Sequence, residues 1–206
     1  MIAYAAKYYD KLLAATLEHL EIVLITLLIS LVIAAALTVL CSYSRTLSRV
    51  MLNLFSMIYS VPSLALLALL IPITGLGRKT AIVALVIYNQ YLLLRNFLAG
   101  LDGVDRGVME AAAGMGMTHL QILWKVQIPL AKKALIAGLR IALVSTVGIA
   151  TIAASINAGG LGTILFDGLR TMNTAKILWG SLLSAVLAIG IDRLLLLVER
   201  KSERSV

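Results

Sequence analysis

Long apolar runs separated by short polar segments set the pattern of this chain. A helix that crosses a bilayer needs about 20 mostly apolar residues, because each residue adds about 1.5 Å across a hydrocarbon core about 30 Å thick. Five segments meet this requirement: Ile22–Leu40, a stretch within Val50–Gly77, Thr80 to about Gly100, about Pro129 to Ile156, and Ile177 to about Val198. The pattern therefore predicts an all-α membrane protein with five spans.

The third of these runs carries a charge inside its predicted span. Its uncharged part, Thr80–Leu94, is too short to cross a bilayer alone, so the helix must continue past Arg95. A long basic side chain can place its charge at the membrane surface while its stem stays in an apolar environment. We expect Arg95 to extend toward one interface in this way.

The N-terminal part of the chain places apolar and charged side chains on opposite faces of a helix. Its charged face holds Lys7, Asp10, Lys11, Glu18 and Glu21, and its apolar face holds Ile2, Ala5, Ala6, Tyr9, Leu12, Leu13, Thr16, Leu17 and Leu20. Such a helix suits the interface between lipid and water. We therefore predict an amphipathic interfacial helix at 1–20, a single membrane domain at 21–200 and a short tail at 201–206.

The composition agrees with a membrane protein. Hydrophobic residue types make up 61% of the 206 residues and charged types 14%, against about 45–50% and about 25% in soluble domains. The apolar excess must face lipid or other membrane helices. The formal net charge of +8 does not indicate nucleic-acid binding, because the basic residues lie at the ends of apolar runs and form no stripe with interleaved aromatic residues.

The basic residues also predict the orientation of the chain, because five spans place its two termini on opposite sides of the membrane. One side collects Lys7, Lys11, Arg78, Lys79, Arg170 and Lys176. The other collects the remaining 12 of the 18 basic residues: Arg45, Arg49, Arg95, Arg106, Lys125, Lys132, Lys133, Arg140, Arg193, Arg200, Lys201 and Arg204. Lys and Arg concentrate in cytoplasmic loops, so we predict an external N-terminus and a cytoplasmic C-terminus.

The segment 101–128 is the most polar stretch between two spans, and this orientation places it in the cytoplasm. Its pattern predicts two short helices. Asp102 or Asp105 can cap the first helix with a side-chain oxygen. Gly116 stands between the two helices, where the chain must reverse its direction.

The second short helix carries its own start and stop signals. Thr118 followed by Gln121 has the pattern of a capping box, in which each side chain bonds the other residue's backbone N–H. Pro129 is expected to end this helix, since the residue before a proline avoids helical geometry.

One motif in this segment matches a known family. The sequence reads Glu110-Ala111-Ala112-Ala113-Gly114-Met115-Gly116, and after nine further residues Val126-Gln127-Ile128-Pro129. In residue type and spacing it resembles the signature of the permease subunits of bacterial ATP-binding-cassette (ABC) importers. The resemblance implies the type I importer permease fold, in which the second helix of this loop docks into a cytoplasmic ATPase.

The resemblance makes this loop the expected coupling element. The residues assigned to coupling are Glu110, Ala111, Ala112, Gly116, Thr118, Leu120, Leu123, Trp124 and Pro129. Small side chains at 111 and 112 would let another backbone approach closely, and the large apolar residues of the second helix would form a plug. The alternative is an ordinary helical hairpin that binds no partner.

The resemblance also implies the partners: an ABC ATPase dimer in the cytoplasm, a substrate-binding protein outside, and a second permease that is either an identical or a related chain. ATP and Mg²⁺ would then bind the partner ATPase, and this chain would bind no cofactor and be no enzyme. Consistently, the sequence has no Gly-Lys-Ser or Gly-Lys-Thr phosphate loop. His19 and His119 lack the spacing of metal ligands.

Further matches point to one branch of the family. Gly75-Leu76-Gly77-Arg78-Lys79-Thr80, Leu94-Arg95-Asn96 and Ala158-Gly159-Gly160-Leu161-Gly162 resemble permeases for osmoprotectants such as glycine betaine, carnitine and choline. Permeases for D-methionine have a similar Ala-Gly-Gly-Leu-Gly and form the alternative. A channel or a membrane-bound enzyme would be a different class, and an enzyme would need convergent polar groups that the spans scarcely offer.

Several residues are candidates for lining the translocation path: Tyr59, Tyr88, Asn89, Tyr91, Ser155 and Asn157. Tyr88 and Tyr91 are three residues apart and share a helix face, and aromatic faces attract quaternary ammonium groups. The alternative is that these side chains pack or hydrogen-bond between helices.

Overall fold

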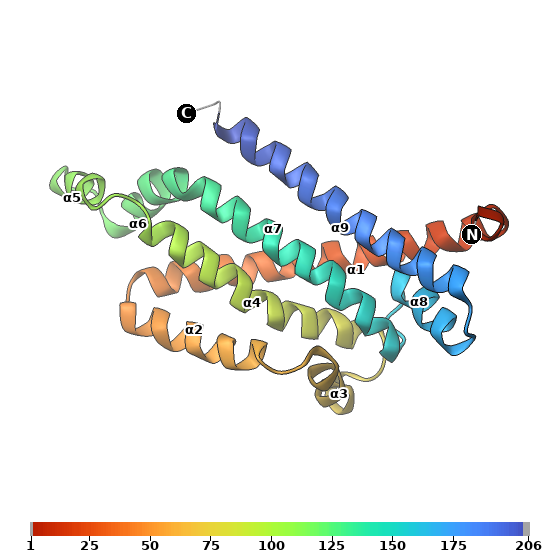
Figure 1. Cartoon of the computed structure of the whole chain (residues 1–206). Coiled ribbons are helices and arrows are strands. Elements are labelled where there is room, and N and C mark those ends of the chain that lie inside the picture. The colour runs from red at the N-terminus through yellow and green to blue at the C-terminus, as the bar shows by residue number, and fades with distance from the viewer. Residues whose placement is uncertain (1, 204–206) are drawn as a thin grey trace.

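The computed structural model describes residues 2–203, which form helices joined by short loops (Figure 1). Met1, from the predicted N-terminal helix, and residues 204–206, from the predicted tail, lie outside the described residues. The α-helices are α1 (Ile2–Ser42), α2 (Arg45–Tyr59), α3 (Ser63–Thr74), α4 (Arg78–Asp102), α5 (Arg106–Gly114), α6 (His119–Ile122), α7 (Ile128–Ala153), α8 (Leu161–Arg170) and α9 (Thr174–Glu203). A π-helical turn at Leu123–Gln127 precedes α7, and a 3₁₀ turn at Ala154–Ile156 follows it.

Four described helices are long and apolar enough to cross a membrane: Tyr4–Ser42, Arg78–Asp102, His119–Ile156 and Thr174–Leu197. A fifth span is counted when α2 and α3 are taken together, although the two helices are bent by 95°. The prediction of an all-α membrane fold is confirmed. The second predicted span, within Val50–Gly77, is not one straight helix: Pro62 interrupts the helical hydrogen bonding, and α3 begins directly after it.

The first span differs from its predicted boundaries. No break separates 1–20 from the apolar run in the described chain; α1 departs from helical backbone angles at Tyr8 (φ −125°, ψ 27°) and otherwise continues to Ser42. The segment between these residues contains neither proline nor glycine, so nothing in it interrupts the helix. One buried stripe with helical spacing runs along it: Leu12, Ala15, His19, Ile22, Val23, Thr26, Ser30, Ala34, Thr38 and Cys41. At the other end of the chain, α9 includes residues 201–203 of the predicted tail.

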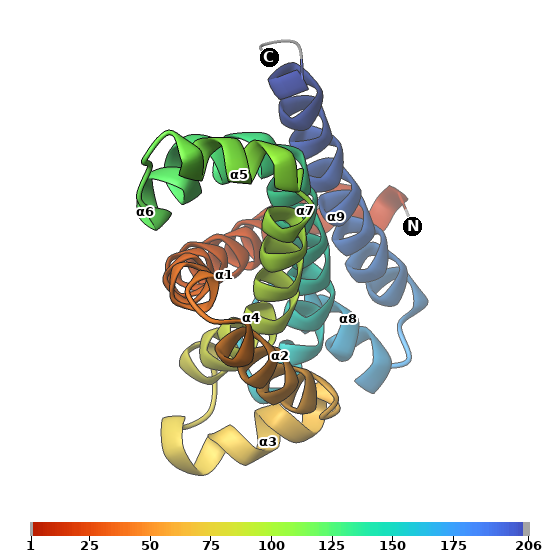
Figure 2. The ribbon, with the colours of Figure 1, turned by 90° about the vertical axis from the view of Figure 1, so that its left-hand side faces the viewer.

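The helices α1, α4 and α7 form the centre of the molecule, and α9 packs on α7 (Figure 1). Hydrophobic clusters join them, one of them around Val23, Leu85 and Val147. The helices α5 and α6 lie at one end of this bundle, whereas α3 and α8 lie toward the opposite end (Figures 1 and 2). The fold thereby places the 101–128 segment and the glycine-rich loop at 157–160, between the 3₁₀ turn and α8, at opposite ends.

Candidate coupling site and transport path

The segment 101–128 forms a hairpin of two short helices, α5 and α6. Local contacts fix the first of these helices. Asp105, rather than Asp102, caps α5, because its Oδ1 accepts a hydrogen bond from the Val108 backbone N–H at 3.2 Å. The helix ends at Gly114, and Gly116 adopts a φ of +80°. This left-handed conformation favours glycine, which agrees with the predicted reversal of the chain at this residue.

The second short helix starts with the predicted capping box. The Thr118 N–H donates to Gln121 Oε1 at 2.8 Å, and the Gln121 N–H donates to Thr118 Oγ1 at 3.4 Å. These reciprocal bonds satisfy two backbone donors that a helix start otherwise leaves free. The start of α6 is therefore ordered without help from a partner.

The apolar side chains of the hairpin divide between its surface and the interior. Leu120 and Trp124 are 45% and 60% exposed, four residues apart on one face, and Met115, which follows α5, is 76% exposed. Leu123, which was assigned to the same plug, is fully buried against Leu101 and α7. The assignment of Leu123 to a docking surface is therefore wrong, because its side of the helix faces the chain's own core.

The small and polar residues of the signature lie at different depths. Ala112 is 2% exposed and already packed within the chain, whereas Ala111 and Glu110 are exposed. Thr118 and Gly116 are exposed as well. Only some of the predicted coupling residues are thus accessible to a partner, and Ala112 serves the packing of the hairpin itself.

Pro129 does not end the second helix, which corrects the sequence-based expectation. Gln127 and Ile128 both keep helical backbone angles, and the Ile128 N–H donates to the Leu123 carbonyl five residues earlier. This wider π-helical turn leaves room for the proline ring, and a proline in the first turn of α7 needs no N–H donor. As a result, His119–Ile156 forms one continuous helical segment, so that α6 is directly joined to a span.

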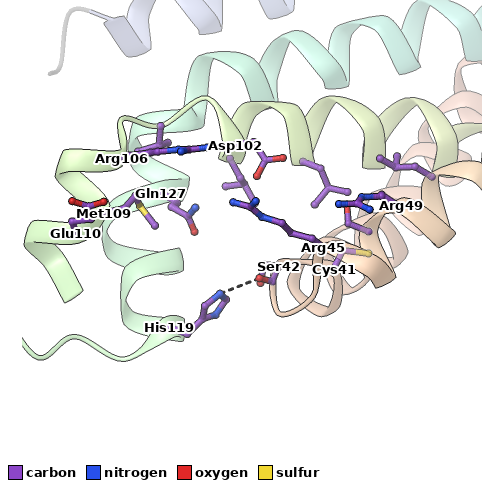
Figure 3. A pocket seen from close by; sticks show the side chains of 15 residues that line it. Cys41, Ser42, Arg45, Arg49, Asp102, Arg106, Met109, Glu110, His119 and Gln127 are labelled. Carbon is purple, nitrogen blue, oxygen red and sulfur yellow. Dashed lines mark hydrogen bonds between the residues drawn. The ribbon is translucent and has the colours of Figure 1, made fainter. Parts of the chain in front are cut away.

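A cavity of about 810 Å³ lies between the hairpin and the corner where α1 meets α2 (Figure 3). Its lining includes the basic residues Arg45, Arg49 and Arg106 and the acidic residues Asp102 and Glu110. Figure 3 shows the Arg45 side chain reaching from α2 into this space. Glu110 of the signature therefore lines a cavity to which α2 and α5 also contribute arginines.

His119 links the hairpin to the α1–α2 corner. Its Nε2 lies 3.1 Å from the Ser42 carbonyl oxygen, within hydrogen-bonding distance. Its ring also packs on the Tyr43 ring at 4.5 Å between centroids. The sequence pattern gave no sign of this contact, because it joins residues 77 positions apart.

The candidate path tyrosines come together at the end of α2. The Tyr59 ring contacts the Tyr88 ring edge-on, with centroids 5.6 Å apart, and lies 5.0 Å from the Tyr91 ring. Tyr88 is 3% exposed, and its hydroxyl donates to the Val61 carbonyl. Tyr59 and Tyr91 are only partly buried, so these two rings are the accessible part of the cluster.

The other candidate path residues are separate from this pair. Asn89 is 2% exposed; its Nδ2 donates to Ser30 Oγ at 3.3 Å, and its Oδ1 accepts from Thr146 Oγ1 at 3.1 Å. It holds α1, α4 and α7 together, and its assignment to the path surface is wrong. Ser155 keeps a buried hydroxyl without a hydrogen-bond partner. Asn157 is exposed with a φ of 63°.

The glycine-rich loop is held by residues that the sequence analysis did not select. The Gly160 N–H donates to Glu18 Oε2 at 3.1 Å, and a Cβ atom on Gly160 would come within 2.9 Å of His19 Nδ1. His19 itself lies 3.2 Å from the Val147 carbonyl oxygen. The Gly160 end of the loop is thus packed against α1.

A family model for the "Binding-protein-dependent transport system inner membrane component" matches residues 26–204 of the chain. The glycine betaine/carnitine/choline transport system permease protein OpuCB of Bacillus subtilis is 37% identical over 201 residues, which cover 98% of this chain and 93% of that protein. The osmoprotectant import permease protein OsmW of Salmonella typhimurium is 34% identical over 189 residues, with coverages of 89% and 88%.

Solved structures give the same picture of the fold. A chain of the inward-facing MetNI methionine ABC transporter superposes with a TM-score of 0.85 at 25% identity, covering 93% of this chain and 95% of that one. A chain of an amino acid ABC transporter determined with histidines gives a TM-score of 0.83 at 21% identity, with 98% of both chains covered. The expected type I importer permease fold is thereby confirmed.

Proposed function

Since the family model spans residues 26–204, this chain belongs to the inner membrane components of binding-protein-dependent transport systems, and we propose that it carries small quaternary-amine or zwitterionic osmoprotectants across the membrane. It would do so as the permease of an ABC importer and perform no covalent chemistry. The names of its relatives support this substrate class, because they include permeases for glycine betaine, carnitine and choline.

The observation that carries the coupling role is the exposed apolar face of the hairpin. Leu120 and Trp124 lie open on a helical segment whose start is already ordered by its capping box, and Met115 at the end of α5 is exposed as well. A pre-ordered apolar surface binds a partner at a lower entropic cost than a flexible loop would. A cytoplasmic ATPase dimer, which holds ATP and Mg²⁺, is the partner that suits this surface, and α6 would pass its movement directly into α7.

Two further partners complete the proposed importer. A single copy of the chain leaves a long apolar face of α9 exposed. Its residues Val186, Ile189, Leu194 and Leu197 are all more than half exposed. A second permease, identical or related, would enclose the path between the two chains in a two-fold arrangement. A substrate-binding protein would deliver the solute at the outer face, where the N-terminus is proposed to lie.

Reconstitution tests this function directly. The permease, its ATPase and its binding protein are incorporated into liposomes, and ATP-dependent uptake of labelled glycine betaine, carnitine, choline and D-methionine is measured. We expect uptake of at least one quaternary amine that requires both ATP and the binding protein. Uptake of D-methionine with none of the amines would reject the osmoprotectant assignment, and uptake without ATP would reject the importer class.

A further inference from the structure

A charged side chain lies inside the α4 span and faces outward from the chain. Arg95 is exposed, and seven residues of α4 follow it, which places it about 10 Å from that end of the helix. A guanidinium that faces hydrocarbon is costly, so charged residues at this depth face a watery cavity or a protein partner, or else extend to the interface.

Arg95 does not extend toward the nearer end of its helix. Its Nη1 donates to the Tyr91 hydroxyl at 2.9 Å, one turn closer to the middle of α4. Its Cζ also lies 5.8 Å from the centre of the Tyr91 ring. This direction follows the general tilt of helical side chains toward the helix N-terminus. The charge is thereby held within the span.

The guanidinium has unused capacity for an anion. Arg78, Arg140 and Lys176 each form an ion pair with an acidic side chain of the chain, and Arg95 takes part in none of these pairs. An arginine presents several N–H donors in a planar fork that fits a carboxylate with two parallel bonds. The hydroxyl of Tyr91 occupies only one of these donors.

A surface for a cation lies directly beside this anion acceptor. The partly buried rings of Tyr59 and Tyr91 lie 5.0 Å apart with their planes inclined by 35°, and Tyr88 supports Tyr59 edge-on. Quaternary ammonium groups bind aromatic faces within about 6 Å of the ring centre. The side chains that accept a cation and an anion are therefore one helical turn apart.

We propose that Tyr59, Tyr91 and Arg95 form a binding station within the span for zwitterions that carry both a quaternary ammonium and a carboxylate. The ammonium contacts the tyrosine rings, and the carboxylate binds the Arg95 guanidinium. Choline, which has the same cation but no carboxylate, lacks the second contact and meets an uncompensated positive charge. This inference rests on the proposed function and adds to it a selectivity of the permease for carboxylated amines.

The test compares variants in the reconstituted importer at a saturating concentration of loaded binding protein. For each substrate, the uptake rate of the variant is divided by that of the wild type, so that the selectivity of the binding protein cancels. We expect Arg95→Gln to reduce uptake of glycine betaine about tenfold or more, as the loss of a charge-assisted hydrogen bond predicts, and to leave uptake of choline unchanged or raise it. Arg95→Lys keeps the charge and should retain part of the glycine betaine uptake.

Two tyrosine variants and one arginine control complete the experiment. Tyr59→Leu should reduce uptake of both substrates, whereas Tyr91→Phe keeps the ring and should reduce both less. Arg200→Gln alters an exposed arginine at the end of α9 and should leave both rates unchanged. ATPase binding and gel-filtration profiles establish which variants are folded.

The outcomes separate this inference from the proposed function. Equal losses of glycine betaine and choline uptake in a folded Arg95→Gln complex would overturn the binding station, as would unchanged uptake of both substrates. A wild-type importer that moves none of the quaternary amines would overturn the proposed function, and this inference with it.

Discussion

Replacing Gly116 with alanine tests whether the hairpin geometry couples this permease to an ATPase. The residue has a φ of +80°, and a Cβ atom added there would meet no other atom within 4 Å. The variant therefore has no steric clash, and its cost is the backbone strain of a left-handed conformation, about 1–2 kcal/mol for a residue with a side chain. The strain acts on the turn that orients α6 relative to α5.

The expected size of the effect follows from this strain. A cost of about 1–2 kcal/mol lowers the population of the docking-competent turn by a factor of roughly 5–30. Because the partner must restore that geometry on binding, the Kd of the ATPase should rise by about the same factor. Gly116→Asn should show a smaller rise, since asparagine tolerates the left-handed region better than alanine.

Gly114 provides a matched control two residues away. It is the last residue of α5, its φ lies outside the left-handed region, and a Cβ atom there also meets nothing within 4 Å. Gly114→Ala should therefore leave the affinity unchanged. The assay is titration of the purified ATPase onto permease in nanodiscs, with thermal unfolding measured on the same samples. Equal Kd values for Gly114→Ala and Gly116→Ala would refute the reasoning.

Three other experiments give sharp outcomes. Leu123→Asp should prevent folding or lower the yield, because it buries a charge in the core, whereas Leu120→Asp should leave a folded permease that no longer captures the ATPase in pull-downs; the reverse result would contradict the assignment of surface and interior. Arg140→Gln should lower the midpoint of thermal unfolding, since Arg140 forms ion pairs of 2.9 and 2.7 Å with Asp192 and Glu199 across α7 and α9; an unchanged midpoint would show that these pairs add nothing. A reporter that is active only in the cytoplasm should be active when fused to the C-terminus, and silence there, with activity of a periplasmic reporter, would invert the predicted topology.

Features that depend on neighbouring residues could be predicted from the sequence. The capping box of Thr118 and Gln121 and the reversal at Gly116 each involve residues within one or two turns, so their patterns carry the geometry directly. The spans are equally local, because a bilayer selects for the length and polarity of a single segment. The signature motif could then be placed correctly on a hairpin beside a span.

Features that depend on what packs against a residue could not be predicted in the same way. Leu120 and Leu123 are chemically identical and stand three residues apart in one continuous helical segment, yet one is exposed and the other faces Leu101 and α7. Asn89 has the polarity of a path residue, but its partners on α1 and α7 are more than 50 positions away. Pro129 lies in the first turn of α7 rather than at the end of a helix. The π-helical turn before it makes this placement possible, and the sequence pattern does not show that turn.

The helix α2 connects the cavity beside the hairpin with the aromatic pair of Tyr59 and Tyr91. It begins at Arg45, which reaches into the cavity beside Glu110, and ends at Tyr59, which contacts Tyr91. Its 15 residues form a rod about 22 Å long, so a tilt of about 10° at one end would move the other by about 4 Å. None of its residues is fully buried within the chain, but Met51, Leu52 and Phe55 pack on Leu94 and Leu98 of α4. A shift of the hairpin against the α1–α2 corner would therefore alter both the aromatic pair and the packing of α2 on α4.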